Sequence, residues 1–224
     1  MYWILFIGIA VISYFVQENL KSKFEQFSKV PLDVNMTGAQ VAEKMLHDNH
    51  IYDVKVVSTS GMLTDHYNPT TKTVNLSEGV YGSNSVAAAA VAAHECGHAI
   101  QHADAYAPLK LRSALVPIVS FSSQIVSWVL LGGILLINSF PQLLLLGIIL
   151  FAATTLFSFV TLPVEIDASR RAVAWLEGTR IAYAEKHDMA KSALRSAAYT
   201  YVVAALSSLA TLLYYVLIYT NRRD

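Results

Sequence analysis

The chain is short of cysteine and of charge. Its 224 residues include a single cysteine, Cys96, so an intramolecular disulfide and a cysteine-cluster metal site are both excluded. Asp, Glu, Lys and Arg make up 14% of the residues, whereas a typical soluble domain has about 25%. The formal net charge is zero, and the sequence contains neither a Lys/Arg-rich block nor a nucleic-acid-binding motif. Nucleic acid is therefore not expected as a partner.

Hydrophobic residues make up 54% of the chain, and they are gathered in long runs. This distribution indicates a membrane protein rather than a large soluble core. Four runs are present, at residues 2–16, 115–137, 143–162 and 199–219. The first would rise only about 22 Å as a helix, which is the short limit for a bilayer span. It lacks the basic start and the small-x-small cleavage site of a signal peptide, so we interpret it as an uncleaved anchor.

The basic residues between the runs predict the orientation of the chain. Lys and Arg number eight in residues 17–112, six in residues 163–198 and two in the carboxy-terminal tail. Four spans would place the first two segments, with fourteen of these residues, on one face and the tail, with two, on the other. An excess of Lys and Arg is typical of the cytosolic face. The predicted organisation is an anchor at 1–17, a cytosol-facing catalytic segment at 18–112, a transmembrane hairpin at 113–163, a cytosol-facing helix at 164–198, and a fourth transmembrane helix with the tail at 199–224.

The first polar segment predicts both helices and short strands. An amphipathic helix is expected at 35–49, and an Ala-rich helix at 86–106. Alternating and β-branched residues predict strands at 51–57, 62–67 and 73–76. We expect the strand at 73–76, which directly precedes the Ala-rich helix, to be the sheet edge along which an extended peptide binds.

The Ala-rich helix carries an H-E-x-x-H motif, from His94 to His98. Positions i and i+4 lie on one face of a helix, so both imidazoles can bind one zinc ion. Glu95 lies on the flank of that face and is the expected general base. Cys96 projects away from the ligand face, and we interpret it as a small buried side chain rather than a nucleophile. Gly97, on the other flank, would allow a second helix to approach closely.

Glu165 is the predicted third ligand of the metal. It follows Pro163, which we expect to end the third apolar run and to open a polar helix over 164–177. Two spans separate His98 from Glu165, so both return to the same side of the membrane. Ser169, one turn further, can form a hydrogen bond with a ligand. His102 lies about 12 Å along the helix axis from the first histidine, and a structural role is expected for it.

Other polar residues near Glu165 allow more than one role. Asp167 points away from Glu165 and is expected to be solvated or paired with Arg170 or Arg171. Either arginine could instead stabilise the oxyanion of a tetrahedral intermediate. The remaining histidines are expected at the surface, although His66 and Tyr67, beside the predicted hairpin, could border the cleft.

Three blocks of the chain, residues 63–69, 92–102 and 162–171, resemble the YugP-like family of bacterial membrane zinc metallopeptidases. The resemblance covers most of the chain, and it implies a neutral zinc-dependent peptidase of the bacterial plasma membrane. The chain is more distantly similar to membrane-bound gluzincins, which pair H-E-x-x-H with a downstream E-x-x-x-D. Glu165 matches the Glu of that pattern, and Ser169 stands where the Asp would be. The implied fold is mainly helical with a small sheet.

The predicted protein is a mainly α integral membrane protein with about four transmembrane helices and a zincin-like (gluzincin) domain. We expect it to hydrolyse peptide bonds of peptide or protein substrates with a zinc-activated water, Glu95 acting as general base. Two alternatives stay open at this point. One is cleavage inside the bilayer, and the other is a non-catalytic membrane scaffold with a structural zinc.

Overall fold

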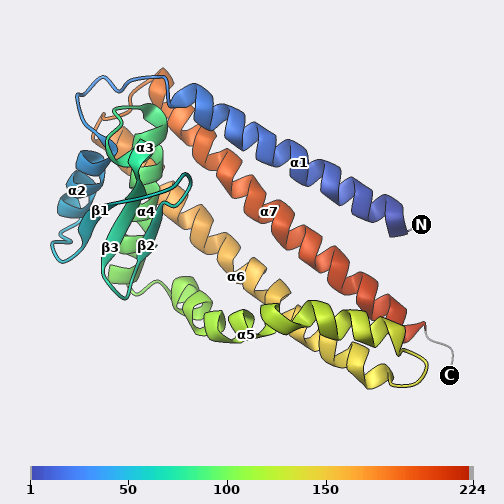
Figure 1. The fold of residues 1–224 in the computed structure, drawn as a ribbon. Coiled ribbons are helices and arrows are strands. Elements are labelled where there is room, and N and C mark those ends of the chain that lie inside the picture. The colour runs from blue at the N-terminus through green and yellow to red at the C-terminus, as the bar shows by residue number, and fades with distance from the viewer. Residues whose placement is uncertain (1, 222–224) are drawn as a thin grey trace.

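Four long helices extend from one end of the molecule, where the short elements gather (Figure 1). The computed structural model describes residues 2–221, apart from the side chains of residues 2, 3 and 5. The long helices are α1 (Tyr2–Phe27), α5 (Ala107–Leu135), α6 (Pro141–Gly178) and α7 (Glu185–Thr220). They pack in the order α5, α6, α7, α1. The start of α1, the end of α7 and the turn between α5 and α6 lie at the far end, away from the sheet (Figure 1).

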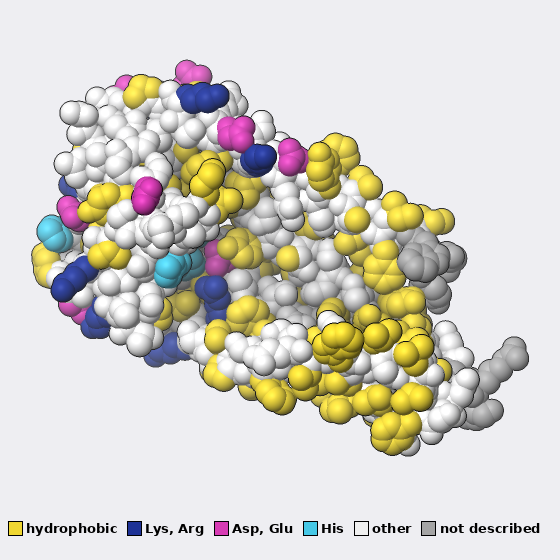
Figure 2. Space-filling model, viewed as in Figure 1, with side chains coloured by type: hydrophobic (Ala, Val, Ile, Leu, Met, Phe, Trp, Pro, Cys, Tyr) yellow, Lys and Arg dark blue, Asp and Glu magenta, His cyan; other side chains and the backbone are white. Residues whose placement is uncertain are grey.

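Three of the described helices, α5, α6 and α7, are long and apolar enough to cross a membrane. Helix α6 has 38 residues and so rises about 57 Å, which exceeds the hydrocarbon core of about 30 Å. Its polar carboxy-terminal part therefore extends beyond a bilayer. Figure 2 shows the same division: hydrophobic side chains cover the long helices, and charged side chains gather over the sheet end. The fourth span stays a prediction.

The prediction that a new helix opens at Pro163 is wrong, because α6 runs without interruption from Pro141 to Gly178 and Pro163 lies inside it. Proline removes one backbone donor from the helix, and a helix that is packed on both sides can accommodate that loss. The α6 backbone contacts both α5 and α7. The apolar run and the residues after it therefore form one continuous helix, which carries Glu165 directly beyond the candidate span.

The sheet has three strands in the order β1-β3-β2. They are β1 (Lys55–Thr59), β2 (His66–Asn68) and β3 (Thr73–Ser77). Strand β3 pairs in parallel with β1 and antiparallel with β2. The prediction that residues 73–76 form an edge is therefore wrong: Val74 and Leu76 of β3 are fully buried, and the edge nearer the motif helix is β2. The first strand also begins later than predicted, because residues 51–54 lead into it as irregular chain.

The core of this end is built around α4 (Val86–Ala103), which lies between α2 (Gly38–Asp48), α6 and α7. Ser85 caps α4 by accepting the Ala88 N–H, and Thr37 forms a capping box with Gln40 at the start of α2. Seven of the eight alanines of α4 are buried, and Ala103 at its end is exposed. Their small side chains let neighbouring helices approach on several sides, and this packing brings distant parts of the chain to the motif. The short helix α3 (Glu78–Tyr81) connects β3 to α4.

Candidate metal centre

Helices α4 and α6 touch at Gly97. A Cβ atom built on Gly97 would lie 2.7 Å from the carbonyl oxygen of Ala168, a distance that no side chain tolerates. Only glycine therefore permits this approach, as the sequence predicted for the flank opposite Glu95. The contact places the ligand face of α4 directly against the polar part of α6.

The crossing brings His94, His98 and Glu165 together. Glu165 Oε2 lies 3.3 Å from His94 Nε2 and 3.6 Å from His98 Nε2, and the potential ligand atoms of the three residues all lie within 4.8 Å of one another. All three side chains are largely buried. Two imidazole nitrogens and one carboxylate oxygen are a donor set typical of catalytic zinc, which keeps a fourth position open for water or substrate. The residues thus fit zinc.

The second ring nitrogen of each histidine is also hydrogen bonded. His94 Nδ1 lies 3.1 Å from Ser169 Oγ, so Ser169 contacts a predicted ligand from the position where gluzincins have Asp. His98 Nδ1 lies 3.1 Å from Gln101 Oε1. Burial lowers the pKa of His98, but hydrogen bonding to Glu165 and the charges of nearby carboxylates outweigh it and raise the pKa overall.

Gln101 determines the tautomer of His98. Its side chain is fully buried, and its Nε2 donates to Val164 O at 2.8 Å and to Asp167 Oδ2 at 3.0 Å. Since the nitrogen end is used by two acceptors, Oε1 must accept from His98, and His98 carries its proton on Nδ1. When His98 is neutral, Nε2, on the Glu165 side, is then free to bind a metal. A metal ligand requires this tautomer.

Glu95 lies beside this group, and its carboxylate is tied to the sheet. It is only 8% exposed, and its Oε2 accepts the backbone N–H of Tyr67 at 3.0 Å. The edge strand β2 therefore fixes the carboxylate that the motif assigns as general base. A second contact joins the same elements, because Tyr67 OH lies 2.8 Å from His102 Nδ1. His102 thus contacts β2 and is not part of the three-residue group formed by His94, His98 and Glu165.

Two residues near Glu165 were missed by sequence reasoning. Arg112 of α5 lies 3.4 Å from Glu165 Oε1, and the Tyr201 phenol of α7 lies beside the Glu165 carboxylate. Neither stands in a motif, and each belongs to a helix whose pattern predicts only a span. The basic side chain of Arg112 at the start of an apolar run was the one available signal. Four helices, α4 to α7, therefore meet at this centre.

The other polar residues form a network that reaches the centre through Gln101, which donates to Asp167. Asp167 is buried and pairs with both Arg170 and Arg171, and Arg171 also pairs with Asp104 at 2.6 Å. Pairing with arginine was predicted for Asp167, whereas the alternative of a solvated side chain is wrong. Both arginines are engaged by carboxylates, so the oxyanion role considered for them receives no support.

Cys96 is fully buried on the opposite side of α4. Its Sγ lies 3.4 Å from the carbonyl oxygen of Ala42 in α2, and burial raises the pKa of the thiol well above its usual value. A buried, protonated thiol is a poor nucleophile, so the packing role predicted for Cys96 agrees with its surroundings.

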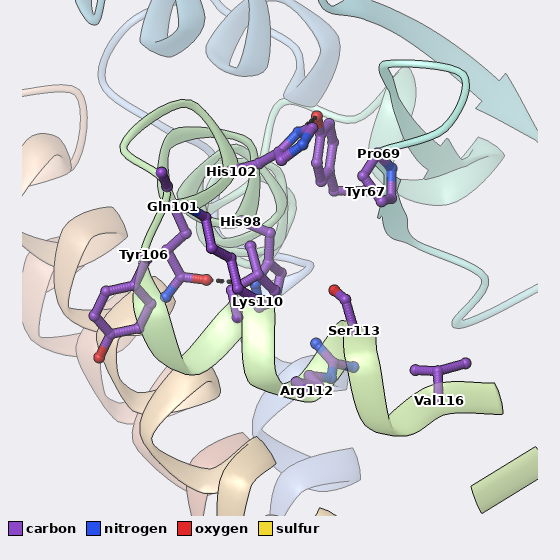
Figure 3. A pocket seen from close by; sticks show the side chains of 12 residues that line it. Tyr67, Pro69, His98, Gln101, His102, Tyr106, Lys110, Arg112, Ser113 and Val116 are labelled. Atoms are coloured by element: carbon purple, nitrogen blue, oxygen red, sulfur yellow. Dashed lines mark hydrogen bonds between the residues drawn. The ribbon is translucent and has the colours of Figure 1, made fainter. Parts of the chain in front are cut away.

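A cavity of about 520 Å³ opens beside His98 (Figure 3). Strand β2 and the following turn contribute Tyr67 and Pro69, the end of α4 contributes His98, Gln101 and His102, and residues 105–116 form the remaining wall. The cavity therefore adjoins the three-residue group through His98, and through Arg112, which contacts Glu165.

Comparison with known proteins places this geometry in context. A family model described as "Putative neutral zinc metallopeptidase" matches residues 2–220. The chain is 43% identical over 222 residues to the "Putative membrane protease YugP" of Bacillus subtilis (strain 168), and the match covers 98% of each chain. No solved structure was found to match the chain.

Proposed function

Because the chain belongs to this family of neutral zinc metallopeptidases, we propose that it is a membrane-embedded zinc metalloendopeptidase. The similar Bacillus protein is named "Putative membrane protease YugP", which supports a peptide or protein as substrate. The observation that carries the proposal is the meeting of His94, His98 and Glu165 within 4.8 Å. Glu165 lies on another helix, 71 positions after His94 and 67 after His98, so the convergence of the three residues is a property of the fold.

In this proposal His94, His98 and Glu165 hold one zinc ion. When bound, zinc lowers the pKa of water and polarises a peptide carbonyl. Ser169 and Gln101 orient the two imidazoles from behind, and residues with this role commonly change metal affinity when they are replaced. Arg112 balances the charge of Glu165 on the side away from the histidines.

Glu95 is the proposed general base. It takes a proton from the attacking water and later delivers a proton to the leaving amine. The hydrogen bond from the Tyr67 N–H occupies Oε2, so Oε1 is the oxygen that we assign to proton transfer. A base beside the metal has no purpose in a purely structural zinc site. Glu95 therefore favours catalysis over the scaffold alternative.

The proposal includes the membrane arrangement. Helix α1 would be the fourth span, and its exposed Ile4, Ile7 and Ile12 support contact with lipid. The excess of Lys and Arg at the sheet end supports a cytosolic active site in the plasma membrane of a bacterium. The metal-binding residues would then lie near the rim of the bilayer, because Glu165 follows the apolar run of α6 by one turn. The motif itself is on α4, which is not among the apolar spans, and this favours cleavage outside the hydrocarbon core.

A pair of variants tests the proposal in the purified full-length chain. Glu95→Gln is expected to reduce peptide hydrolysis by at least about a thousandfold while it keeps a full equivalent of zinc, because the amide cannot accept the proton. His98→Ala is expected to lose both zinc and hydrolysis. Peptide hydrolysis and zinc content would be measured on the same samples. Full hydrolysis by zinc-checked Glu95→Gln protein would contradict the proposed mechanism.

A further inference from the structure

We propose that the cavity beside His98 is a substrate subsite that selects an acidic side chain, with Lys110 as the selecting residue. The inference rests on the proposed peptidase function and adds a substrate class to it. It depends on three features of the cavity: its position, the charge of its lining, and a lysine in that lining that has no ion-pair partner among the described residues.

The cavity is placed to hold a residue close to the bond that is cleaved. Its floor includes His98, and its wall on the sheet side includes Tyr67, whose N–H holds Glu95. A peptide positioned over the three-residue group would therefore direct a neighbouring side chain into this space. The volume of about 520 Å³ is ample for one large side chain together with water.

The charged residues that line the cavity are all basic. Among the described lining residues these are Lys110 and Arg112, and no Asp or Glu is present. Two acidic residues lie behind this lining: Glu165 pairs with Arg112 and is a proposed zinc ligand, and Glu95 accepts the Tyr67 N–H. A cavity lined by one sign of charge attracts the opposite charge and disfavours a like charge.

The two cations differ in what they already contact. Arg112 pairs with Glu165, so its charge is used by the metal centre. Lys110 is exposed, and no carboxylate forms an ion pair with it among the described residues. Figure 3 shows both side chains on the first turns of α5, on the cavity side of that helix. Lys110 is therefore the cation available to a substrate.

The rest of the lining suits the aliphatic stem of a glutamate. Leu109 and Val116 lie on the α5 side and Tyr106 at the helix start, so apolar surface surrounds the cation. Since α5 also begins its apolar run here, the cavity lies where the polar end meets the span. An acidic residue in a peptide segment at the membrane surface is the ligand that matches this site.

A charge-reversal experiment tests the inference. The full-length zinc-loaded chain and its Lys110→Glu variant would digest the same proteome-derived peptide library, and mass spectrometry would identify the cleaved positions. At one position near the cleaved bond, wild-type protein is expected to show Asp or Glu enriched over Lys or Arg by about tenfold. The Lys110→Glu variant is expected to remove or reverse that enrichment. Lys110→Arg is expected to keep it, which separates charge from folding.

Lys191→Glu is the matched control. Lys191 is also an exposed lysine on a helix, but it does not line the cavity, so this variant should keep the wild-type preference. Unchanged acid enrichment in active Lys110→Glu protein, or no acid enrichment in wild type, would overturn the inference and leave the peptidase function standing. If zinc-loaded wild type cleaved no peptide in the library, the proposed function itself would be contradicted.

Discussion

At the scale of single residues, the proposed metal site depends on side chains that never touch the metal. The two imidazoles are aimed by Ser169 and Gln101, and Gln101 in turn is held by a backbone carbonyl and by Asp167. A buried amide with three hydrogen bonds has one allowed orientation, because any flip would place a donor against a donor or an acceptor against an acceptor. The ligand geometry is therefore fixed before a metal arrives.

Replacing Gln101 by leucine tests this orientation. The substitution keeps the approximate size but removes the acceptor for His98 Nδ1, so zinc affinity is expected to fall about 10- to 100-fold. Competition with a chromogenic chelator would measure the affinity. Gln142→Leu, at an exposed position at the far end of α6, is the control and should leave it unchanged. Equal affinity in Gln101→Leu and wild type would show that the amide does not position the ligand.

Cys96 provides a second prediction at this scale. Because its side chain is fully buried and faces α2 rather than the metal-binding residues, Cys96→Ala is expected to retain hydrolysis within about twofold per zinc-loaded molecule. The lost sulfur leaves a small cavity, and a stability loss of about 1–2 kcal/mol is expected by thermal or denaturant unfolding. Loss of hydrolysis in a folded, zinc-loaded variant would instead implicate the thiol in the reaction.

At the scale of helices and strands, the contact between α4 and α6 decides whether the site forms. The two helices carry all three predicted ligands, and Gly97 is the point at which their backbones meet. Strand β2 adds the tether of Glu95. Small displacements of α6 would therefore separate Glu165 from both histidines without altering any ligand.

Gly97→Ala tests the helix contact. The new Cβ would overlap the Ala168 backbone, so α6 must shift, and a loss of about 1–3 kcal/mol in unfolding free energy is expected together with weaker zinc binding. Gly79→Ala is the control, because nothing lies within 4 Å of a Cβ atom at that position. Unaltered zinc affinity and stability in Gly97→Ala would contradict the close approach.

Local pattern predicted the elements that depend on local chemistry. The motif helix, the amphipathic helix at α2 and the apolar runs follow from spacing, and Gly97 was correctly expected to permit close packing. The strand order was not predictable, because β3 lies between β1 and β2 through pairings that a single strand pattern does not encode. The continuation of α6 through Pro163 depends on packing by α5 and α7, which local proline chemistry cannot report.

The candidate site, like the fold, could be predicted only in part from the sequence. His94, His98 and Glu165 were expected together from their residue types and from the number of apolar runs between them. Arg112 and Tyr201 were not, because each reaches Glu165 from a different helix. Long-range contacts of this kind arise from tertiary packing, and no spacing within one segment reveals them.

At the scale of the whole molecule, the proposed metal site, joined to long apolar helices, should couple metal binding to stability. The proposed ligands belong to α4 and to the polar part of α6, which is continuous with a candidate span. Zinc would bind the folded chain and not the unfolded one, so free zinc at a hundred times its Kd should stabilise the fold by about 2.7 kcal/mol. Thermal unfolding in detergent with added zinc and with a chelator would measure the shift. A Tm that is the same in both would count against a metal shared by these helices.

Zinc content measured across a set of ligand variants tests the central proposal most directly. The purified wild-type chain and its His94→Ala, His98→Ala, Glu165→Ala and His102→Ala variants would be compared by elemental analysis, each with a check of folding by circular dichroism. About one zinc per chain is predicted for wild type and for His102→Ala, and a near-complete loss for the other three. A full equivalent of zinc in folded Glu165→Ala protein, or its loss in His102→Ala, would contradict the proposed site.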